Sequence, residues 1–196
     1  MILLVDNYDS FTYNLAQFIQ EFAEVEVIRN DADNLFQRAE MASGIILSPG
    51  PGKPSAAGNL EALIQKKANE TPILGICLGH QAIGEVFGAN VSQANEIRHG
   101  KISQMTCAES ELFQGLPTTF EVMRYHSLIV QKNSLGAELC SLGEALDDKE
   151  MMAMQVRGKP VFGLQFHPES IGTPFGKQII GNFIEITKKE GGVKNG

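Results

Sequence analysis

Residues 72–87 read PILGICLGHQAIGEVF, and at one cysteine they change from a strand pattern to a helix pattern. The apolar run Pro72–Ile76 predicts a buried strand, and Leu78–Phe87 predicts a helix. Cys77 stands between them, with a glycine two residues away on either side. In a nucleophile elbow, such a strand-to-helix turn exposes one side chain and directs the helix N-terminus at it. Because that end of a helix favours negative charge, Cys77 is expected to be a reactive thiolate.

A lone cysteine is more often a small core residue, and the elbow by itself is equally compatible with an enzyme of the α/β-hydrolase type. The flanking glycines and the strand–helix setting favour a nucleophile at Cys77. Cys107 and Cys140 lack that setting, so we expect them to fill apolar space. An odd number of cysteines without paired spacing indicates a reducing compartment rather than a disulfide framework.

The segments before the elbow alternate between strand and helix patterns, which predicts a mostly parallel sheet with helices on both faces. Val25 and Val27 alternate with glutamates and predict a peripheral strand. Ser10 is the expected N-cap of the first helix. The buried stripe of that helix is predicted to comprise Phe11, Leu15, Phe18, Ile19 and Phe22. The other predicted elements are the strands Ile2–Val5 and Gly44–Ser48 and the helix Asn59–Lys67.

The segments after the elbow contain short strand-like runs that are too closely spaced for crossover helices, so antiparallel pairing is expected. Thr173 and Pro174 supply an N-cap and a first-turn proline for a last helix. We therefore expect one α/β domain over residues 1–188, with an antiparallel extension of the sheet, and a frayed polar tail over residues 189–196. The strand-like runs are Ile102–Thr106, Phe120–Tyr125, Leu139–Leu142, Met151–Val156 and Val161–Gln165.

A histidine and a glutamate follow the last of these runs, in the segment Phe166–Ser170. A cysteine nucleophile needs a base within hydrogen-bond reach, and the base needs an acceptor that orients it. His167 would lie at the same sheet edge as the elbow, where α/β proteins place their sites. Glu169 is close enough in sequence to hold the imidazole in the required tautomer. A His-x-Glu pair is common on surfaces, but Pro168 between the two residues, at this edge, favours a catalytic pair.

Glycines also follow the buried strand Gly44–Ser48, in the segment Ser48-Pro49-Gly50-Pro51-Gly52. Their flexibility lets backbone N–H groups face a ligand, as an oxyanion hole requires. Lys53 follows, but a phosphate loop is improbable because Pro54 replaces the Ser/Thr and Leu47 replaces the first glycine. Taken alone, the segment is equally compatible with a rigid turn.

The composition argues against several classes of function. A net charge of −7 and a pI near 5.1 argue against nucleic acid as the main partner. No apolar run reaches the ~20 residues of a membrane span, and the apolar N-terminal run Ile2–Val5 predicts a strand rather than a signal peptide. We expect a cytoplasmic protein without membrane contact. The histidines and cysteines show no zinc-binding spacing, so neither a metal nor a cofactor is expected in this chain.

Together these segments resemble the class I, or triad, glutamine amidotransferases, most of all the glutaminase subunits of anthranilate synthase and aminodeoxychorismate synthase. The elbow and the His-Pro-Glu segment mark the superfamily. Asp6–Phe11 and Arg124–Leu128 narrow the resemblance to the chorismate-linked branch. The resemblance covers nearly the whole chain and implies a flavodoxin-like α/β fold. The matching segments are Asp6–Thr12, Ser48–Gly52, Gly75–Gln81, His99–Lys101, Arg124–Leu128, Gln165–Ser170 and Asn182–Phe183.

The resemblance implies a role for each residue of the triad. Cys77 would attack the side-chain amide of glutamine and form a glutamyl thioester. His167 would pass a proton to the departing ammonia, and Glu169 would orient His167. Backbone N–H groups of Leu78 and of the loop Gly50–Gly52, which includes Pro51, would stabilise the oxyanion.

Further residues are implied as contacts to the substrate. Gln81, one helical turn beyond the nucleophile, resembles a contact to the amino-acid end of glutamine. Ser127 and Leu128 resemble backbone contacts to its α-carboxylate. His80 and His126 could be taken for additional bases. We expect instead that His80 points off the elbow helix and that His126 shapes the turn at Ser127.

The resemblance also implies that the partner is a chorismate-using synthase, in a heterodimer or heterotetramer. Ammonia released into neutral water is mostly protonated, so the synthase must receive it before solvent does. Nothing in the chain indicates a chorismate or Mg²⁺ site, so Mg²⁺ is expected only on the partner. His99–Lys101 and Asn7–Ser10 are expected to form surface near that partner.

Two other functions are compatible with the same scaffold. One is a stand-alone enzyme, such as a γ-glutamyl hydrolase or a cysteine peptidase, and Arg124–Leu128 argues against it. The other is a non-catalytic regulatory subunit, and the intact set Cys77, His167 and Glu169 argues against that.

Overall fold

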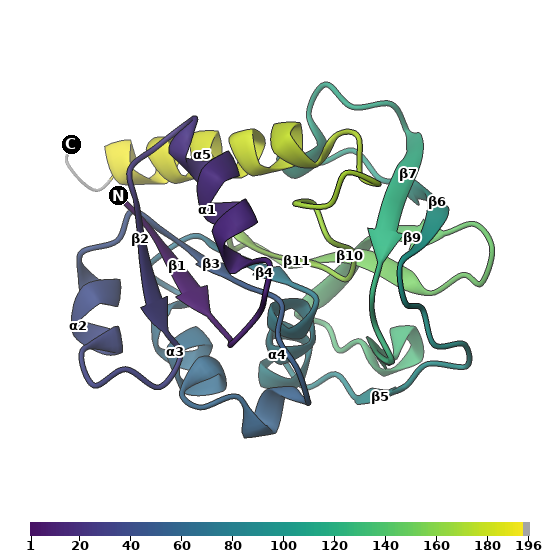
Figure 1. Cartoon of the computed structure of the whole chain (residues 1–196), viewed down its shortest axis with the longest axis horizontal. Helices are drawn as coiled ribbons and strands as arrows, with labels where there is room; N and C mark the ends of the chain where they lie inside the picture. Colours follow the sequence, from purple (N-terminus) through teal and green to yellow (C-terminus); the bar gives the residue numbers. More distant parts are fainter. Residues whose placement is uncertain (194–196) are drawn as a thin grey trace.

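The computed structural model describes residues 1–193 and contains a nine-stranded sheet in the order β2-β1-β3-β4-β11-β10-β9-β6-β7 (Figure 1). The first five strands in this order are parallel. Four of them are buried along their whole length and are apolar except for Asp6: β1 (Ile2–Asp6), β3 (Gly44–Leu47), β4 (Ile73–Ile76) and β11 (Val161–Leu164). β2 (Val25–Arg29) lies at the edge and is half-buried, which confirms the expected peripheral strand.

Helices cover both faces of the parallel half, as predicted (Figure 1). Burial on both faces is why these strands are continuously apolar instead of alternating. One face carries α1 (Thr12–Gln20) and α5 (Gly176–Val193), which pack on one apolar core. The other carries α2 (Leu35–Glu40), α3 (Leu60–Lys67) and α4 (Leu78–Val86), which pack on a second.

The second half of the sheet is antiparallel, which also confirms the prediction. It consists of β10 (Met151–Val156), β9 (Leu139–Ala145), β6 (Lys101–Cys107) and β7 (Thr119–Arg124). β10 pairs with β11 and joins this extension to the parallel half. A separate two-stranded sheet pairs β5 (Val91–Gln93) with β8 (Leu128–Val130). Short 3₁₀ turns occupy Pro54–Ala56, Glu111–Phe113 and Lys132–Ser134.

The first helix differs from the prediction at its start. α1 begins at Thr12 after an N-cap at Phe11, not at Ser10, and no side chain caps it. Asp9 instead accepts a hydrogen bond from the backbone N–H of Phe11 (2.8 Å) and so organises the turn before the helix. Phe11 and Phe22 are 45% and 38% exposed, so they do not belong to the buried stripe.

The last helix also differs at both ends. Thr173 does not cap it, because its hydroxyl accepts from the backbone of Met123 (3.0 Å) and donates to the carbonyl of His167 (2.8 Å). α5 therefore begins at Gly176. It continues to Val193, so the first five residues of the expected 189–196 tail are helical, and residues 194–196 lie outside the described part of the chain.

Candidate active site

Three neighbouring parallel strands bring three distant segments to one edge of the sheet. β4 lies between β3 and β11, so their carboxyl ends are adjacent. The Gly50 loop follows β3, Cys77 follows β4, and His167 follows β11. A cavity of about 310 Å³ opens at this edge and is lined by Gly50, Pro51, Cys77 and His167, among others. The juxtaposition predicted from the strand pattern is therefore present.

Cys77 has a strained backbone at the start of α4. Its φ of 50° and ψ of −97° are unusual for a residue with a side chain, and such strain is concentrated at functional sites. The backbone N–H of Cys77 donates to the carbonyl of Leu164 on β11 (2.7 Å), which anchors the turn to the neighbouring strand. A Cβ on Gly75 would lie 2.4 Å from the carbonyl of Gly79, so this tight turn requires glycine there.

His167 and Glu169 form a buried pair. The Nδ1 atom of His167 lies 2.6 Å from Oε1 of Glu169. Burial by itself lowers the pKa of His167, but its interactions with Cys77 and Glu169 outweigh burial and raise the pKa to about 10. His167 is therefore protonated at neutral pH and forms an imidazolium beside Cys77. Its Nε2 atom is buried without a hydrogen-bond partner among the described residues, which leaves that nitrogen for the chemistry of the site.

The loop after β3 is fixed at its base and open at its tip. Asn7 donates through its backbone N–H to the Ser48 hydroxyl (2.9 Å) and through its side chain to the Ser48 carbonyl (2.7 Å). A Cβ on Gly50 would lie 2.5 Å from the carbonyl of Asn7 and 2.9 Å from the side chain of Leu78. Gly52 has a φ of +80°, and a Cβ added there would meet no other described residue within 4 Å. The loop thus packs directly against Leu78, the residue that follows Cys77.

Asn7 was expected at the surface, and that expectation is wrong. Its side chain is buried and also accepts a hydrogen bond from Asn30 (3.0 Å). Its neighbour Tyr8 is 54% exposed and has a φ of 62°. Tyr8 is therefore exposed at this turn, whereas the preceding residue, Asn7, is buried and holds the Gly50 loop in place.

Two of the expected substrate contacts, Gln81 and Leu128, belong to a chain of hydrogen bonds that reaches the Cys77 sulfur. Among the described residues, Gln81, Ser127 and Leu128 do not line the cavity at Cys77. Gln81 donates to the carbonyl of Leu128 (2.9 Å) and lies 3.4 Å from the side-chain oxygen of Gln165. Gln165 in turn donates to the Cys77 sulfur (3.7 Å). Ser127 is exposed next to Leu128. Sequence reasoning missed Gln165, although a glutamine that ends a fully apolar strand was a usable signal.

The two other central histidines are buried and uncharged. His80 was expected to point off its helix, but it is fully buried, because α4 packs its ring against Gly163 of β11. Burial lowers the pKa of His80 to about 4. Burial, followed by the charge of Arg124, lowers the pKa of His126 to about 3. Neither histidine can act as a second imidazolium at neutral pH.

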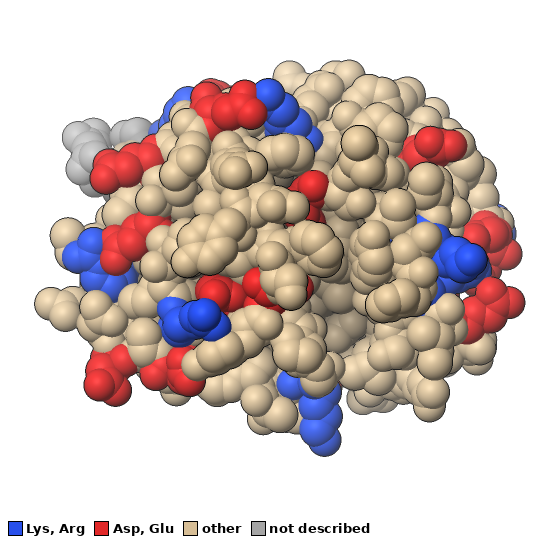
Figure 2. Space-filling model, in the orientation of Figure 1, with Lys and Arg blue, Asp and Glu red and all other residues tan. Residues whose placement is uncertain are grey.

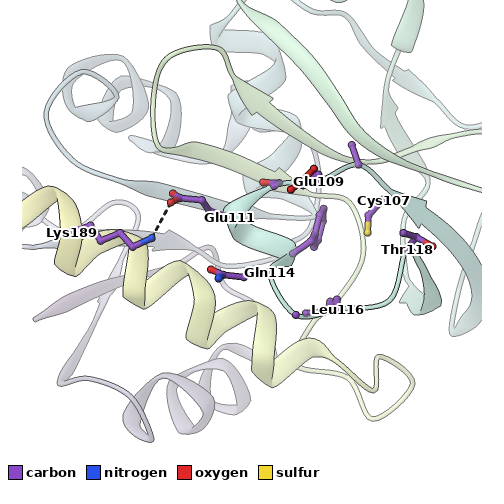
Figure 3. Close-up of a pocket in the computed structure, with 11 residues that line it drawn as sticks. Cys107, Glu109, Glu111, Gln114, Leu116, Thr118 and Lys189 are labelled. Carbon is purple, nitrogen blue, oxygen red and sulfur yellow. Dashed lines mark hydrogen bonds and ion pairs between the residues drawn. The ribbon is translucent and has the colours of Figure 1, made fainter.

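Two further cavities differ in their relation to this site. One of about 330 Å³ adjoins it and is lined by Phe11, Tyr125, His167, Glu169 and Ile171, among others. A larger one, of about 700 Å³, includes Cys107 and is bordered by the Lys189–Glu111 ion pair (Figure 3). The larger cavity contains none of the predicted catalytic residues.

Changing the other cysteines is expected to leave turnover of the substrate nearly unaltered. The thiols of Cys107 and Cys140 contact the carbonyls of Pro117 (3.7 Å) and Gln155 (3.5 Å), and serine can make the same contacts. Burial also raises the pKa of Cys107, which disfavours its thiolate. Steady-state turnover by Cys107→Ser and Cys140→Ser, compared with Cys77→Ser, measures this. Equal losses in all three variants would indicate a folding defect instead of a specific nucleophile.

Comparisons with known proteins agree with this geometry. Residues 3–186 match the family described as "Glutamine amidotransferase class-I". Anthranilate synthase component 2 of Lactococcus lactis is 49% identical over 94% of this chain and 93% of its own length. Aminodeoxychorismate/anthranilate synthase component 2 of Bacillus subtilis is 44% identical over 97% of this chain and 98% of its own. The crystal structure of a protein assigned to GMP synthase, from Thermoplasma acidophilum, superposes with a TM-score of 0.88 at 25% identity, covering 100% of this chain and 97% of that one.

Proposed function

This chain belongs to the class-I glutamine amidotransferase family, and on that basis we propose that it releases ammonia from glutamine for a chorismate-using synthase partner. The observation that carries the proposal is the His167–Glu169 pair, joined at 2.6 Å, beside the strained Cys77 at the carboxyl edge of the sheet. This arrangement has a nucleophile, a proton carrier and an orienting acid in one place.

The reaction follows from the charges of these groups. The thiolate of Cys77 attacks the amide carbon of glutamine, and the electron pair moves onto the carbonyl oxygen. N–H groups of Leu78 and of the loop Gly50–Gly52 stabilise that oxyanion, an interaction that acts in the transition state. When the C–N bond breaks, the proton of His167 passes to the departing nitrogen. Water, deprotonated by His167, then cleaves the thioester to glutamate.

Gln81, Ser127 and Leu128 are the proposed contacts to the amino-acid end of glutamine. The hydrogen bond from Gln81 to Leu128 links the helix of the nucleophile to this segment, which supports a shared binding surface. A Gln81 amide already oriented by this bond has fewer conformations to lose when the substrate binds.

A synthase partner is supported by the surface around the site. Tyr8, Phe11 and Ile171 line the two cavities at His167 and are 54%, 45% and 101% exposed. Exposed apolar groups that surround a polar site are typical of protein interfaces. Figure 2 shows acidic and basic side chains interspersed with uncharged surface on one face of the molecule. Among the described residues no helix is long and apolar enough to cross a bilayer.

The finer assignments follow the relatives. Their names include both anthranilate synthase and aminodeoxychorismate synthase components, so we propose that the synthase served by this chain makes anthranilate or aminodeoxychorismate from chorismate, or that the chain serves both kinds of synthase. We propose a cytoplasmic heterodimer or heterotetramer, in which the partner binds chorismate and Mg²⁺.

We expect a low glutaminase rate from the isolated chain and a marked rise when the synthase binds, more so with chorismate present. The exposed Gly52 permits a peptide flip that turns an N–H toward the oxyanion, and Tyr8 adjoins the residue that packs against Gly50. Tyr8→Ala and Lys101→Glu should weaken the rise without altering alkylation of Cys77. Tyr13→Ala is the matched control, since Tyr13 is 66% exposed but lines neither cavity.

Steady-state ammonia release, measured with and without the partner, tests the coupling. Equal rates in the two states would contradict it and favour a stand-alone hydrolase.

A further inference from the structure

Arg124, the last residue of β7, is completely buried, and all three nitrogens of its guanidinium make polar contacts. Nη1 donates to the Ser103 hydroxyl (3.0 Å), and Nη2 forms ion pairs with Asp148 (2.9 Å) and Glu150. Nε donates to Nε2 of His126 (3.0 Å). A buried charge is retained only when it is paired and hydrogen-bonded, and these contacts meet that need.

The contact with His126 fixes the tautomer of that ring. A guanidinium has only donors, so Nε2 of His126 must be the acceptor and the ring proton of neutral His126 must lie on Nδ1. The low pKa of His126, caused by burial and then by Arg124, agrees with a neutral ring. Nδ1 is buried and has no hydrogen-bond partner among the described residues.

The segment that contains these residues lies between the base and the substrate contacts. The carbonyl of Met123 accepts from the backbone N–H of His167 (2.9 Å), and the Tyr125 ring packs edge-on against His167 with centroids 5.1 Å apart. At the other end, Leu128 accepts from Gln81. Backbone bonds from Arg98 to His126 (3.0 Å) and from Gly100 to Arg124 (3.0 Å) hold one side of this segment. The backbone N–H of Ala94 also donates to the carbonyl of Ser127 (2.8 Å), and β8 pairs with β5 from Leu128 onward. The guanidinium adds a support from the side of the His126 ring.

We propose that Arg124 is a positioning residue for glutamine: by holding His126 as the Nδ1–H tautomer, it fixes the backbone of Ser127 and Leu128 where the α-carboxylate binds. The inference rests on the proposed function, because it requires that these two residues contact glutamine. Arg124 touches no reacting atom in this proposal. Loss of the Arg124 guanidinium should weaken binding of the amino-acid end of glutamine and leave the reactivity of Cys77 unchanged.

The first test measures the tautomer directly and needs no substrate. Nitrogen-15 NMR of the full chain distinguishes Nδ1–H from Nε2–H rings, and the spectrum of His126→Gln assigns the signal. The wild type and Arg98→Lys should show the Nδ1–H form, whereas Arg124→Lys should lose it, because lysine keeps the charge but has a methylene where arginine has the Nε donor. Arg98 is the matched control because its side chain pairs with the same Asp148 (2.8 Å), whereas within the described part of the chain the hydrogen bond to the His126 ring comes from Arg124. An Nε2–H ring in the wild type overturns the proposal, even if Arg124→Lys fails to fold.

The second test separates binding from reactivity in the full chain. Diazo-oxo-norleucine, an electrophilic glutamine analogue, should label Cys77 with saturation, and iodoacetamide serves as a probe without an amino-acid end. In Arg124→Lys the half-saturating concentration of the analogue should rise about tenfold, the effect of one hydrogen bond to a charged group. The maximal labelling rate and the rate with iodoacetamide should change less than about twofold. Arg98→Lys should resemble the wild type in all three quantities.

The outcomes distinguish this inference from the function on which it rests. If the wild type reacts with iodoacetamide but shows no saturation with the analogue, the glutamine site itself is wrong. If the wild type saturates and Arg124→Lys saturates at the same concentration, only the role of Arg124 is wrong. A fall in both labelling rates of Arg124→Lys would indicate general damage to the site and would also overturn it.

Discussion

Cys77→Ser is expected to abolish glutamine-dependent synthesis by the complex while synthesis from added ammonium salts continues. Only the release of ammonia uses the thiolate, whereas the partner consumes ammonia from either source. A serine hydroxyl at neutral pH lacks the ionised character that a thiolate has, so the nucleophile is lost. Product formation from the two nitrogen sources, measured on the same preparation, gives the comparison.

The ammonia-dependent rate is also the control for folding and assembly. Serine differs from cysteine by one atom, and Cys77 is anchored through its backbone to Leu164, so the elbow should persist. Retained glutaminase turnover in Cys77→Ser would show that another residue is the nucleophile.

His167→Ala should reduce kcat/KM for glutamine by ~10²–10⁴-fold, the usual contribution of a positioned proton carrier. Glu169→Gln should cost less, because the amide oxygen can still accept from Nδ1–H and orient the ring. Equal losses from the two substitutions would contradict separate roles for base and orienting acid. Stopped assays of glutamate release across a glutamine series measure both variants.

The pH dependence of Glu169→Gln gives a sharper distinction. The imidazolium of His167 is required to protonate the leaving nitrogen, and its pKa of about 10 places the alkaline limit of activity there. The carboxylate of Glu169 is one of the two groups that raise this pKa, so removing its charge lowers the pKa. The alkaline limb of the variant should therefore move to lower pH. If the alkaline limb of the pH profile does not move, a group other than His167 determines it.

The fold was largely predictable because its signals are local. Fully apolar runs such as Ile73–Ile76, each followed by a turn and a helical stripe, are typical of buried parallel strands. α2 is only six residues long, and β5 and β8 have three residues each. These elements are too short for a repeating pattern of apolar residues to be recognised in the sequence. The start of α1 was misplaced because Asp9, not Ser10, forms the hydrogen bond before the helix.

The placement of Cys77, His167 and Glu169 at one edge of the sheet was predictable for a similar reason, since each follows a recognisable strand. The residues that support the site were not predictable from the sequence. Asn7, Gln165 and Arg124 act through partners 41, 88 and 21 positions away in sequence, and pairings over such distances are decided by tertiary packing. Nothing in the sequence around His80 indicates that its ring packs against Gly163 on β11.

The order of the central strands has a consequence for biosynthesis. β11 lies between β4 and β10 but is the last strand to leave the ribosome. Until it is inserted, β4 presents an open apolar edge, which is the kind of surface that leads to aggregation during synthesis. Cys77 is synthesised early, whereas His167 directly follows β11 in the sequence and is synthesised only after that strand. The chain therefore cannot bring Cys77 and His167 together before β11, the strand that completes the sheet, has been synthesised.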